Sequence, residues 1–196
     1  MFKNLPIYKI ESFSFKDLKL ASETFMKISD VTECIILQNP FRVEVFMVVN
    51  LQKGDIPDAR RSEGKNLTIN QIQKTWESLT ELSEYDLDHL DQTLEVHRNV
   101  DVYQNLLRLA TGLDSIVVGR EEILDEIKKS VSHAQENKTS GKVLNKLFEN
   151  IIRIATSIRD STGISKGTIS LGKIAVRTVD DKAGIKGKKV LLLGTG

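Results

Sequence analysis

The end of the chain constrains its fold more than any other stretch. The continuous apolar run Val190–Leu193 leads directly into Gly194-Thr195-Gly196. Such a run is typical of a strand buried on both faces of a parallel sheet. Gly-x-Gly after a strand begins the turn that holds a dinucleotide, although the third glycine of that motif would fall beyond Gly196. We therefore expect an α/β protein in which a truncated Rossmann domain begins here.

A small sheet is predicted in the N-terminal part of the chain. The apolar run Cys34–Leu37 indicates a buried strand over residues 33–38, and Asn39-Pro40 indicates a turn. Residues 42–49 alternate, with Val43, Val45 and Met47 on one face and Arg42, Glu44 and Phe46 on the other. Residues 5–12 also alternate and are predicted as a third strand.

Helices are predicted wherever apolar residues recur at spacings of three and four. They cover residues 17–28, 68–82, 102–109, 121–136, 143–158 and 168–180. Gly112 and Gly163 are expected to end two of them, and the polar residues 52–66 are expected to form an exposed loop. The predicted architecture is a sheet-and-helix domain over residues 1–142, followed over residues 143–196 by a helical segment and the incomplete Rossmann domain.

Charge and composition exclude several classes of protein. The net charge is +1, but residues 141–196 hold 11 Lys and Arg against 4 Asp and Glu. This basic end could attract a phosphate-bearing partner, although we favour a solvated helix face. No apolar run is long enough for a membrane span, and the N-terminus lacks the apolar core of a signal peptide. One cysteine and three histidines argue against disulfides and a metal site. We expect a cytoplasmic protein.

Two motifs resemble the glutamyl-tRNA reductase family. Residues 110–119 read ATGLDSIVVG, close to the family's ASGLDSMVLG, and residues 163–167 read GISKG, like the family's GIS-basic-G. The resemblance covers essentially the whole chain and is strongest from Leu106 onward. It implies NADPH-dependent reduction of glutamyl-tRNA to glutamate-1-semialdehyde in tetrapyrrole (heme) synthesis. It also implies an NADPH site that includes Gly194, Thr195 and Gly196, and a homodimer formed through a segment absent here.

The resemblance fails at the family's nucleophile. In the motif S-T-C-N-R-x-E, a cysteine attacks the glutamyl ester, and the resulting thioester is reduced. The matching residues 37–44 read LQNPFRVE, so Asn39, Phe41, Arg42 and Glu44 fill substrate positions while Pro40 occupies the catalytic one. Proline offers no nucleophile, so the thioester cannot form at this position. Cys34 lies six residues away, roughly 20 Å along a strand at ~3.3 Å per residue, and is expected to be a buried structural cysteine.

A second departure concerns a histidine that assists the chemistry in the family. The family's His-Leu-Phe-Arg corresponds to Asn105-Leu106-Leu107-Arg108. Asn105 occupies the catalytic position, and an amide can form hydrogen bonds but cannot transfer a proton near neutral pH. His97 does not align with this position and is predicted to be a surface residue.

A third departure follows Ser115, which the family retains and which implies a substrate contact or, alternatively, a helix cap. The family's G-E-x-Q-I-L-x-Q is here Gly119-Arg120-Glu121-Glu122-Ile123-Leu124-Asp125-Glu126. By resemblance Arg120, Glu121, Glu122 and Glu126 are substrate-site residues. Two carboxylates would repel the glutamyl side chain unless Arg42 or Arg120 compensates them. A solvated helix surface is an equally good interpretation.

Three functions therefore stay open. The first is a glutamyl-tRNA reductase that has diverged at its catalytic motif. The second is a non-catalytic paralogue that binds nucleotide, tRNA or a pathway partner, which the residues at positions 40 and 105 favour. The third, resting only on the Gly-x-Gly turn, is an NAD(P)-dependent dehydrogenase of related chemistry, such as siroheme formation.

Overall fold

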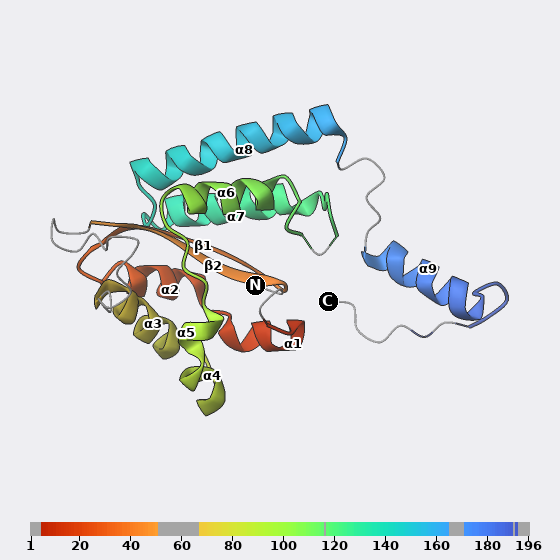
Figure 1. The fold of residues 1–196 in the computed structure, drawn as a ribbon, viewed down its shortest axis with the longest axis horizontal. Coiled ribbons are helices and arrows are strands. Elements are labelled where there is room, and N and C mark those ends of the chain that lie inside the picture. Colours follow the sequence, from red (N-terminus) through yellow and green to blue (C-terminus); the bar gives the residue numbers. More distant parts are fainter. Residues whose placement is uncertain (1–4, 51–66, 116, 165–170, 190, 192–196) are drawn as a thin grey trace.

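A two-stranded antiparallel hairpin forms the centre of the fold. The computed structural model describes residues 5–50, 67–115, 117–164, 171–189 and 191 (Figure 1). Strand β1 covers Val31–Asn39 and strand β2 covers Arg42–Val49, with Asn39 paired to Arg42 across the turn. The predicted strands over 33–38 and 42–49 and the turn at Asn39-Pro40 are thus confirmed.

Helices cover both faces of this hairpin. Figure 1 shows α6 (Val100–Ala110), α7 (Glu122–Glu136) and α8 (Lys142–Thr162) on one side. The other side holds α2 (Leu18–Phe25), α3 (Leu67–Leu79), α4 (Glu84–Asp88) and α5 (Leu90–Thr93). Because both faces are covered, the run Cys34–Leu37 is wholly buried, as its continuous apolar sequence predicts.

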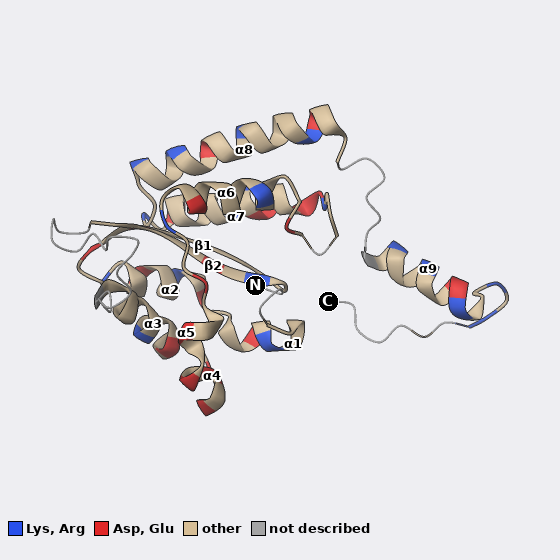
Figure 2. Ribbon diagram, in the orientation of Figure 1, with Lys and Arg blue, Asp and Glu red and all other residues tan. Residues whose placement is uncertain are grey.

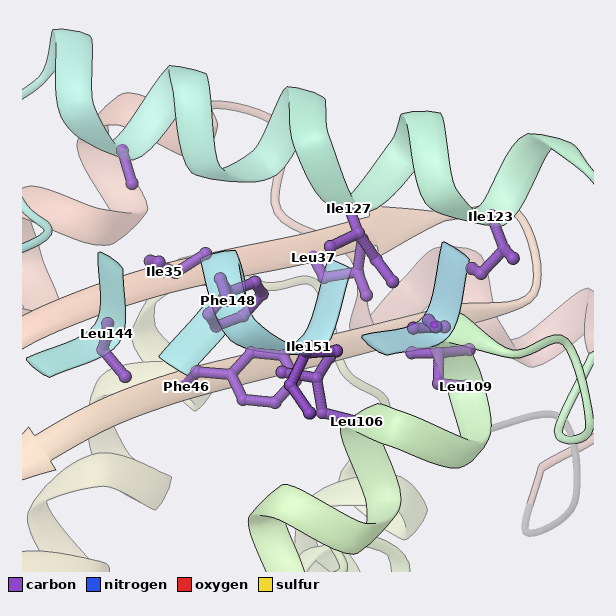
Figure 3. Packing of buried hydrophobic residues seen from close by; sticks show 13 residues of the cluster. Ile35, Leu37, Phe46, Leu106, Leu109, Ile123, Ile127, Leu144, Phe148 and Ile151 are labelled. Carbon is purple, nitrogen blue, oxygen red and sulfur yellow. The ribbon is translucent and has the colours of Figure 1, made fainter. Parts of the chain in front are cut away.

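The larger core joins β1 and β2 to the three helices α6, α7 and α8. Figure 3 shows its main members, which are Ile35, Leu37, Phe46, Leu106, Leu109, Ile123, Ile127, Leu144, Phe148 and Ile151. The rings of Phe46 and Phe148 meet edge to face with centroids 5.1 Å apart. This packing fixes α6 and α7 against the strands, on either side of the segment that joins them.

A smaller core lies on the opposite face of the hairpin. Phe15, Phe25 and Trp76 pack together there with Cys34 and Ile36. The indole Nε1 of Trp76 donates a hydrogen bond of 3.1 Å to the carbonyl oxygen of Phe13, which satisfies the buried polar group. Alternating residues of β2, including Val43, Val45 and Met47, pack against this cluster as predicted.

The predicted strand over residues 5–12 is wrong. The structure has a short helix α1 (Ile7–Ile10) followed by a 3-10 helix, η1 (Glu11–Phe13). Ile10 and Phe13 are buried at a spacing of three, whereas Ile7 is 52% exposed and Tyr8 is 79% exposed. Pro6 favours this start, since it lacks the N–H that a first helical turn leaves unpaired. Over so short a stretch, spacings of two and three fit the same residues.

The predicted helices are present with shifted ends, and the last of them is α9 (Leu171–Ala183). Gly163 ends α8 in the left-handed conformation with φ 62°, as predicted. Helix α8 begins at residue 142, where the carboxylate of Glu33 accepts hydrogen bonds from the backbone N–H groups of Val143 (3.0 Å) and Leu144 (2.7 Å). Because α8 packs into the larger core, it belongs to the same folded unit as α6 and α7. The proposed domain boundary itself stays a prediction.

Some predictions fall outside the described residues, namely the exposed loop over 52–66 and most of the strand Val190–Leu193 with its glycine turn. Leu191, the described residue of that strand, is 82% exposed and lies in no strand, so its predicted burial is wrong. Within the described part, no helix is long and apolar enough to cross a membrane. The same part holds no group of three His, Cys, Asp or Glu side chains placed to bind a metal. Figure 2 shows charges of both signs along α8, where Lys146 pairs with Glu149 at 3.0 Å. This arrangement supports a solvated helix face.

Candidate substrate site

The tip of the hairpin carries Pro40, which the sequence predicts at the position of the family's nucleophile. Pro40 and Phe41 form the two-residue turn, and the side-chain oxygen of Asn39 accepts a hydrogen bond of 2.9 Å from the Phe41 N–H. Pro40 is exposed and presents only its ring. Cys34 is fully buried farther along β1, and burial raises the pKa of its thiol to about 12. Cys34 is therefore the buried structural cysteine that the sequence predicts.

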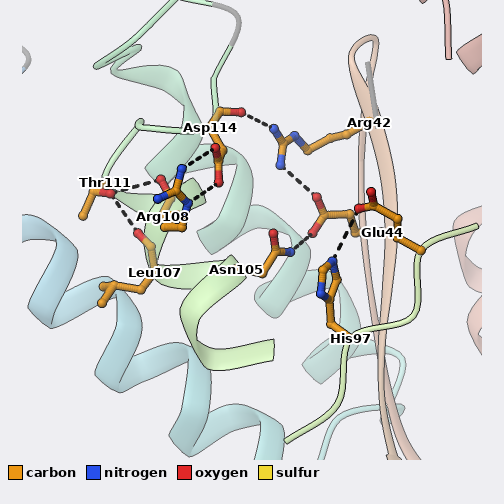
Figure 4. Close-up of polar contacts among 9 residues, drawn as sticks. Arg42, Glu44, His97, Asn105, Leu107, Arg108, Thr111 and Asp114 are labelled. Atoms are coloured by element: carbon orange, nitrogen blue, oxygen red, sulfur yellow. Dashed lines mark hydrogen bonds and ion pairs between the residues drawn. The ribbon is translucent and has the colours of Figure 1, made fainter. Parts of the chain in front are cut away.

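Arg42 is committed to contacts within the protein. Its guanidinium is buried, and Nη1 donates a hydrogen bond of 2.8 Å to the Glu44 carboxylate. Nη2 donates one of 2.6 Å to the carbonyl oxygen of Asp114 (Figure 4). These bonds join β2 to the loop after α6. Arg42 therefore fixes the shape of the site and does not compensate the carboxylates on α7.

Glu44 and Asn105 meet beside this arginine. Burial raises the pKa of the Glu44 carboxyl, while the charge and hydrogen bond of Arg42 act in the opposite direction. The Asn105 amide nitrogen lies 3.5 Å from the second carboxylate oxygen of Glu44 (Figure 4). Asn105, the residue predicted at the family's histidine position, thus contacts a buried acid. An imidazole at this position would have a proton acceptor at hand, whereas the amide supplies only a hydrogen bond.

A cavity of about 370 Å³ adjoins this pair along β2. Glu44, Asn105 and His97 line its polar part, and apolar side chains that include Val45 and Trp76 line the rest. His97 has a partly exposed side chain, as predicted, with Nε2 3.5 Å from a carboxylate oxygen of Glu95. Its place in the same cavity as Asn105 was not predicted, because the segment between α5 and α6 shows no periodic pattern. A mixed cavity of this size is suited to a small polar group.

The loop from Gly112 to Arg120 covers the other side of Arg42. Arg108 holds this loop by two hydrogen bonds, of 2.9 and 3.1 Å, to the Asp114 carboxylate. The hydroxyl of Ser115 is buried and has no hydrogen-bond partner among the described residues. It does not cap α7, which begins at Glu122 without a side-chain cap. The capping interpretation of Ser115 is therefore wrong, and a substrate contact of its hydroxyl stays a prediction.

The altered positions around the tip contact one another. Arg120 forms ion pairs with Glu126 and, at 3.2 Å, with Glu122, and its guanidinium lies 5.4 Å from the centre of the Phe41 ring. Asn39 donates a hydrogen bond of 2.6 Å to Glu126. Arg120, rather than Arg42, thus compensates the two carboxylates. Glu121 is exposed at the start of α7.

The predicted site residues therefore form two linked groups. Arg42, Glu44 and Asn105 form a buried group below the hairpin turn, and Asn39, Phe41, Arg120, Glu122 and Glu126 form a group at the tip. Gly194, Thr195 and Gly196 lie outside the described residues. No site role was predicted for Arg108, Asp114 or Arg159.

Arg159 is the one of these additional residues that lies on α8. It is buried near the end of α8, and burial lowers the pKa of its guanidinium. It donates hydrogen bonds to the carbonyl oxygens of Ala110 (3.3 Å), Gly119 (2.9 Å) and Arg120 (2.9 Å). The buried stripe of α8 offers a signal for it. This stripe runs Leu144, Phe148, Ile151, Ala155 and Arg159, so a charged residue occupies a core position.

Comparison with known proteins places these residues in a family. The sequence model described as "Glutamyl-tRNAGlu reductase, N-terminal domain" matches residues 1–162. The glutamyl-tRNA reductase of Cenarchaeum symbiosum is 37% identical over 196 residues, which are 100% of this chain and 43% of that protein. That of Methanosarcina mazei is 31% identical over 195 residues, covering 99% of this chain and 38% of that protein. This chain therefore spans less than half the length of these curated relatives.

A solved structure, the glutamyl-tRNA reductase from Methanopyrus kandleri, has the same fold. It superposes with a TM-score of 0.64 at 21% identity and covers 93% of this chain and 38% of its own length. This similarity bears out the predicted α/β fold. The family model bears out the resemblance, and residues 110–119 lie within the matched range. The chain belongs to the glutamyl-tRNA reductase family.

Proposed function

We propose that this chain recognises the glutamyl end of glutamyl-tRNA within a protein of tetrapyrrole synthesis, and that it does so without forming a cysteine thioester. The observation that carries the proposal is the exposed Pro40 at the hairpin turn, where the family has its nucleophile. A proline ring cannot attack an ester. The thiol of Cys34 is fully buried, and its raised pKa leaves it protonated near neutral pH.

Recognition, in contrast, has residues to support it. The buried Ser115 hydroxyl has no partner among the described residues, and a buried hydroxyl normally has one. Glu44, Asn105 and His97 line an adjoining cavity that can hold a small polar group. The carboxylates of Glu122 and Glu126 are paired with Arg120, which reduces their repulsion of an acidic substrate.

The remaining family properties are proposals for the full-length protein. NADPH would supply hydride in a reductase of this family, and Gly194, Thr195 and Gly196 are the residues of this chain predicted to contact it. These three residues lie outside the described part, so the proposed cofactor rests on family membership. We also propose a homodimer and, because charged tRNA is made in the cytoplasm, a cytoplasmic location.

A binding experiment tests the proposed recognition. The ligand is tRNA that carries glutamate through a hydrolysis-resistant 3′-amide bond, and the reference is the same tRNA without the amino acid. We expect the chain to bind the glutamyl form about tenfold more tightly, the effect of one or two hydrogen bonds to a charged group. Equal affinity for both forms would contradict the proposal.

Two serine variants make the test specific. Ser115→Ala removes the unpartnered hydroxyl at the site and should reduce the preference for the glutamyl form. Ser140→Ala is the matched control, because the Ser140 hydroxyl is also buried without a partner among the described residues but lies between α7 and α8. It should leave the preference unchanged. Equal losses in both variants would indicate a general effect on folding.

A further inference from the structure

We propose that Arg159 is a positioning residue for glutamate recognition, because it holds the loop from Gly112 to Arg120 in the shape that presents Ser115 and fixes Arg42. This inference rests on the function proposed above. Arg159 belongs to α8 and contacts neither the hairpin tip nor Glu44 by any described hydrogen bond. It therefore acts through the loop.

The contacts of Arg159 close the loop at both of its ends. Its Nη1 bonds the carbonyl oxygen of Ala110, at the end of α6, and its Nη2 bonds those of Gly119 and Arg120. The two ends of the loop also bond each other, since the Gly119 N–H donates to the Gly112 carbonyl oxygen at 3.0 Å. The Arg159 side chain thus bridges the two joined ends of the loop, which we call its neck.

The backbone at this neck has no room for another group. Gly112 has φ +86°, and a Cβ built on it would lie 2.8 Å from the Gly119 Cα and 3.0 Å from the Arg159 Nη1. Any movement of Arg159 away from the neck would break its hydrogen bonds to three carbonyl oxygens, and a side chain at residue 112 would crowd both the Gly119 backbone and the Arg159 guanidinium. The neck is therefore closely packed.

The closed neck determines where the loop's functional groups lie. The loop presents the Asp114 carbonyl oxygen to Arg42 at 2.6 Å and carries the unpartnered Ser115 hydroxyl. Its last residue, Arg120, reaches Glu126 and the Phe41 ring at the hairpin tip. A loosened neck would displace all of these groups together.

The chemistry of the contacts requires an arginine. A guanidinium carries five N–H donors in a rigid fork and can bond three carbonyl groups at fixed angles. A lysine retains the charge near the carboxyl end of α6 but has a single nitrogen on a flexible chain. Arg159→Lys is therefore the informative substitution, since it retains the charge and removes the fork.

The test measures the affinity ratio between the glutamyl-amide tRNA and the uncharged tRNA. In Arg159→Lys we expect this ratio to fall by about tenfold, with little change in affinity for uncharged tRNA. A purely structural role would weaken both affinities equally and leave the ratio unchanged. Arg153→Lys is the matched control, because Arg153 is exposed on the same helix. It should behave like the wild type.

A double-mutant cycle tests the route through the loop. If Arg159 acts by placing Ser115, then Ser115→Ala should reduce the ratio strongly in the wild type and weakly in Arg159→Lys. Additive effects of the two substitutions would overturn the inference. Should Arg159→Lys fail to fold, Gly112→Ala disturbs the same neck without changing residue 159, because the added Cβ crowds the Gly119 backbone and the Arg159 guanidinium. An unchanged ratio in that variant would overturn the inference as well.

The two proposals fail in different ways. A wild-type ratio near one would contradict glutamate recognition itself. A large wild-type ratio that Arg159→Lys retains would leave recognition standing and overturn only the role of Arg159.

Discussion

Asn39 and Glu126 form a hydrogen bond of 2.6 Å that ties the hairpin tip to the second turn of α7. Glu126 also pairs with Arg120, whose guanidinium lies over the Phe41 ring. These four side chains contact one another. The tip is thus held by a set of internal contacts around Pro40.

Removing the charge of Glu126 should loosen this tip. Glu126→Gln loses the ion pair with Arg120 in a half-buried position, and we expect the free energy of unfolding to fall by about 1–2 kcal/mol. Urea denaturation followed by circular dichroism measures the change. Glu122→Gln is the control, because its side chain is 63% exposed and its ion pair should contribute less than about 0.5 kcal/mol. Equal effects in the two variants would contradict the arrangement.

The larger core should respond to the loss of Phe148. The ring is fully buried against Phe46, so Phe148→Ala should lower the free energy of unfolding by about 3–5 kcal/mol. Val143→Ala, at a residue 56% exposed on the same helix, should change it by less than about 0.5 kcal/mol. Chemical denaturation at constant pH compares the two. A small effect of Phe148→Ala would show that α8 does not pack against the hairpin.

The fold and the site differ in how much of them the sequence predicts. Long periodic segments, such as the stripe Leu144 to Ala155, and the run Cys34–Leu37 identify their elements without further information. Residues 5–12 mislead because a four-residue helix and a strand place the same side chains in the core. The hydrogen bonds that build the site join residues that are far apart in the sequence. Arg42 bonds a carbonyl 72 residues away and Arg159 one 49 residues away, and no local pattern encodes such pairs.

The buried thiol should make stability depend on alkaline pH. The pKa of Cys34 is raised from 9.0 to about 12, so its neutral form is favoured in the folded state. The corresponding stabilisation is fully present below about pH 9 and is lost as pH rises toward 12. Cys34→Ala should flatten this part of the stability profile. A wild-type profile no steeper than that of the variant would contradict the burial of the thiol.

Thiol reactivity provides an independent check of the same geometry. Pro40→Cys places a thiol at the exposed turn, where we expect it to react rapidly with a disulfide reagent. In the wild type, Cys34 should react only as fast as the protein opens. Kinetics of reagent release separate the two thiols. A fast reaction in the wild type would show that Cys34 is accessible.

Restoring the family's histidine should produce a titrating pair. In Asn105→His the imidazole would lie beside the Glu44 carboxylate, which should raise the imidazole pKa above its usual value of about 6.5. The added stability should be present below about pH 6.5 and disappear as pH rises through the raised pKa. An NMR titration of the imidazole gives its pKa directly, with His97 and the other native histidines as internal references. A value at or below the usual one would contradict the contact with Glu44.

The central claim, that this domain forms no thioester, has a direct measurement. The chain is incubated with glutamyl-tRNA and its intact mass is recorded under acidic conditions that preserve thioesters. We predict the unmodified mass for the wild type and likewise for Cys34→Ser. A wild-type adduct of one glutamyl group that hydroxylamine removes and Cys34→Ser abolishes would contradict the account.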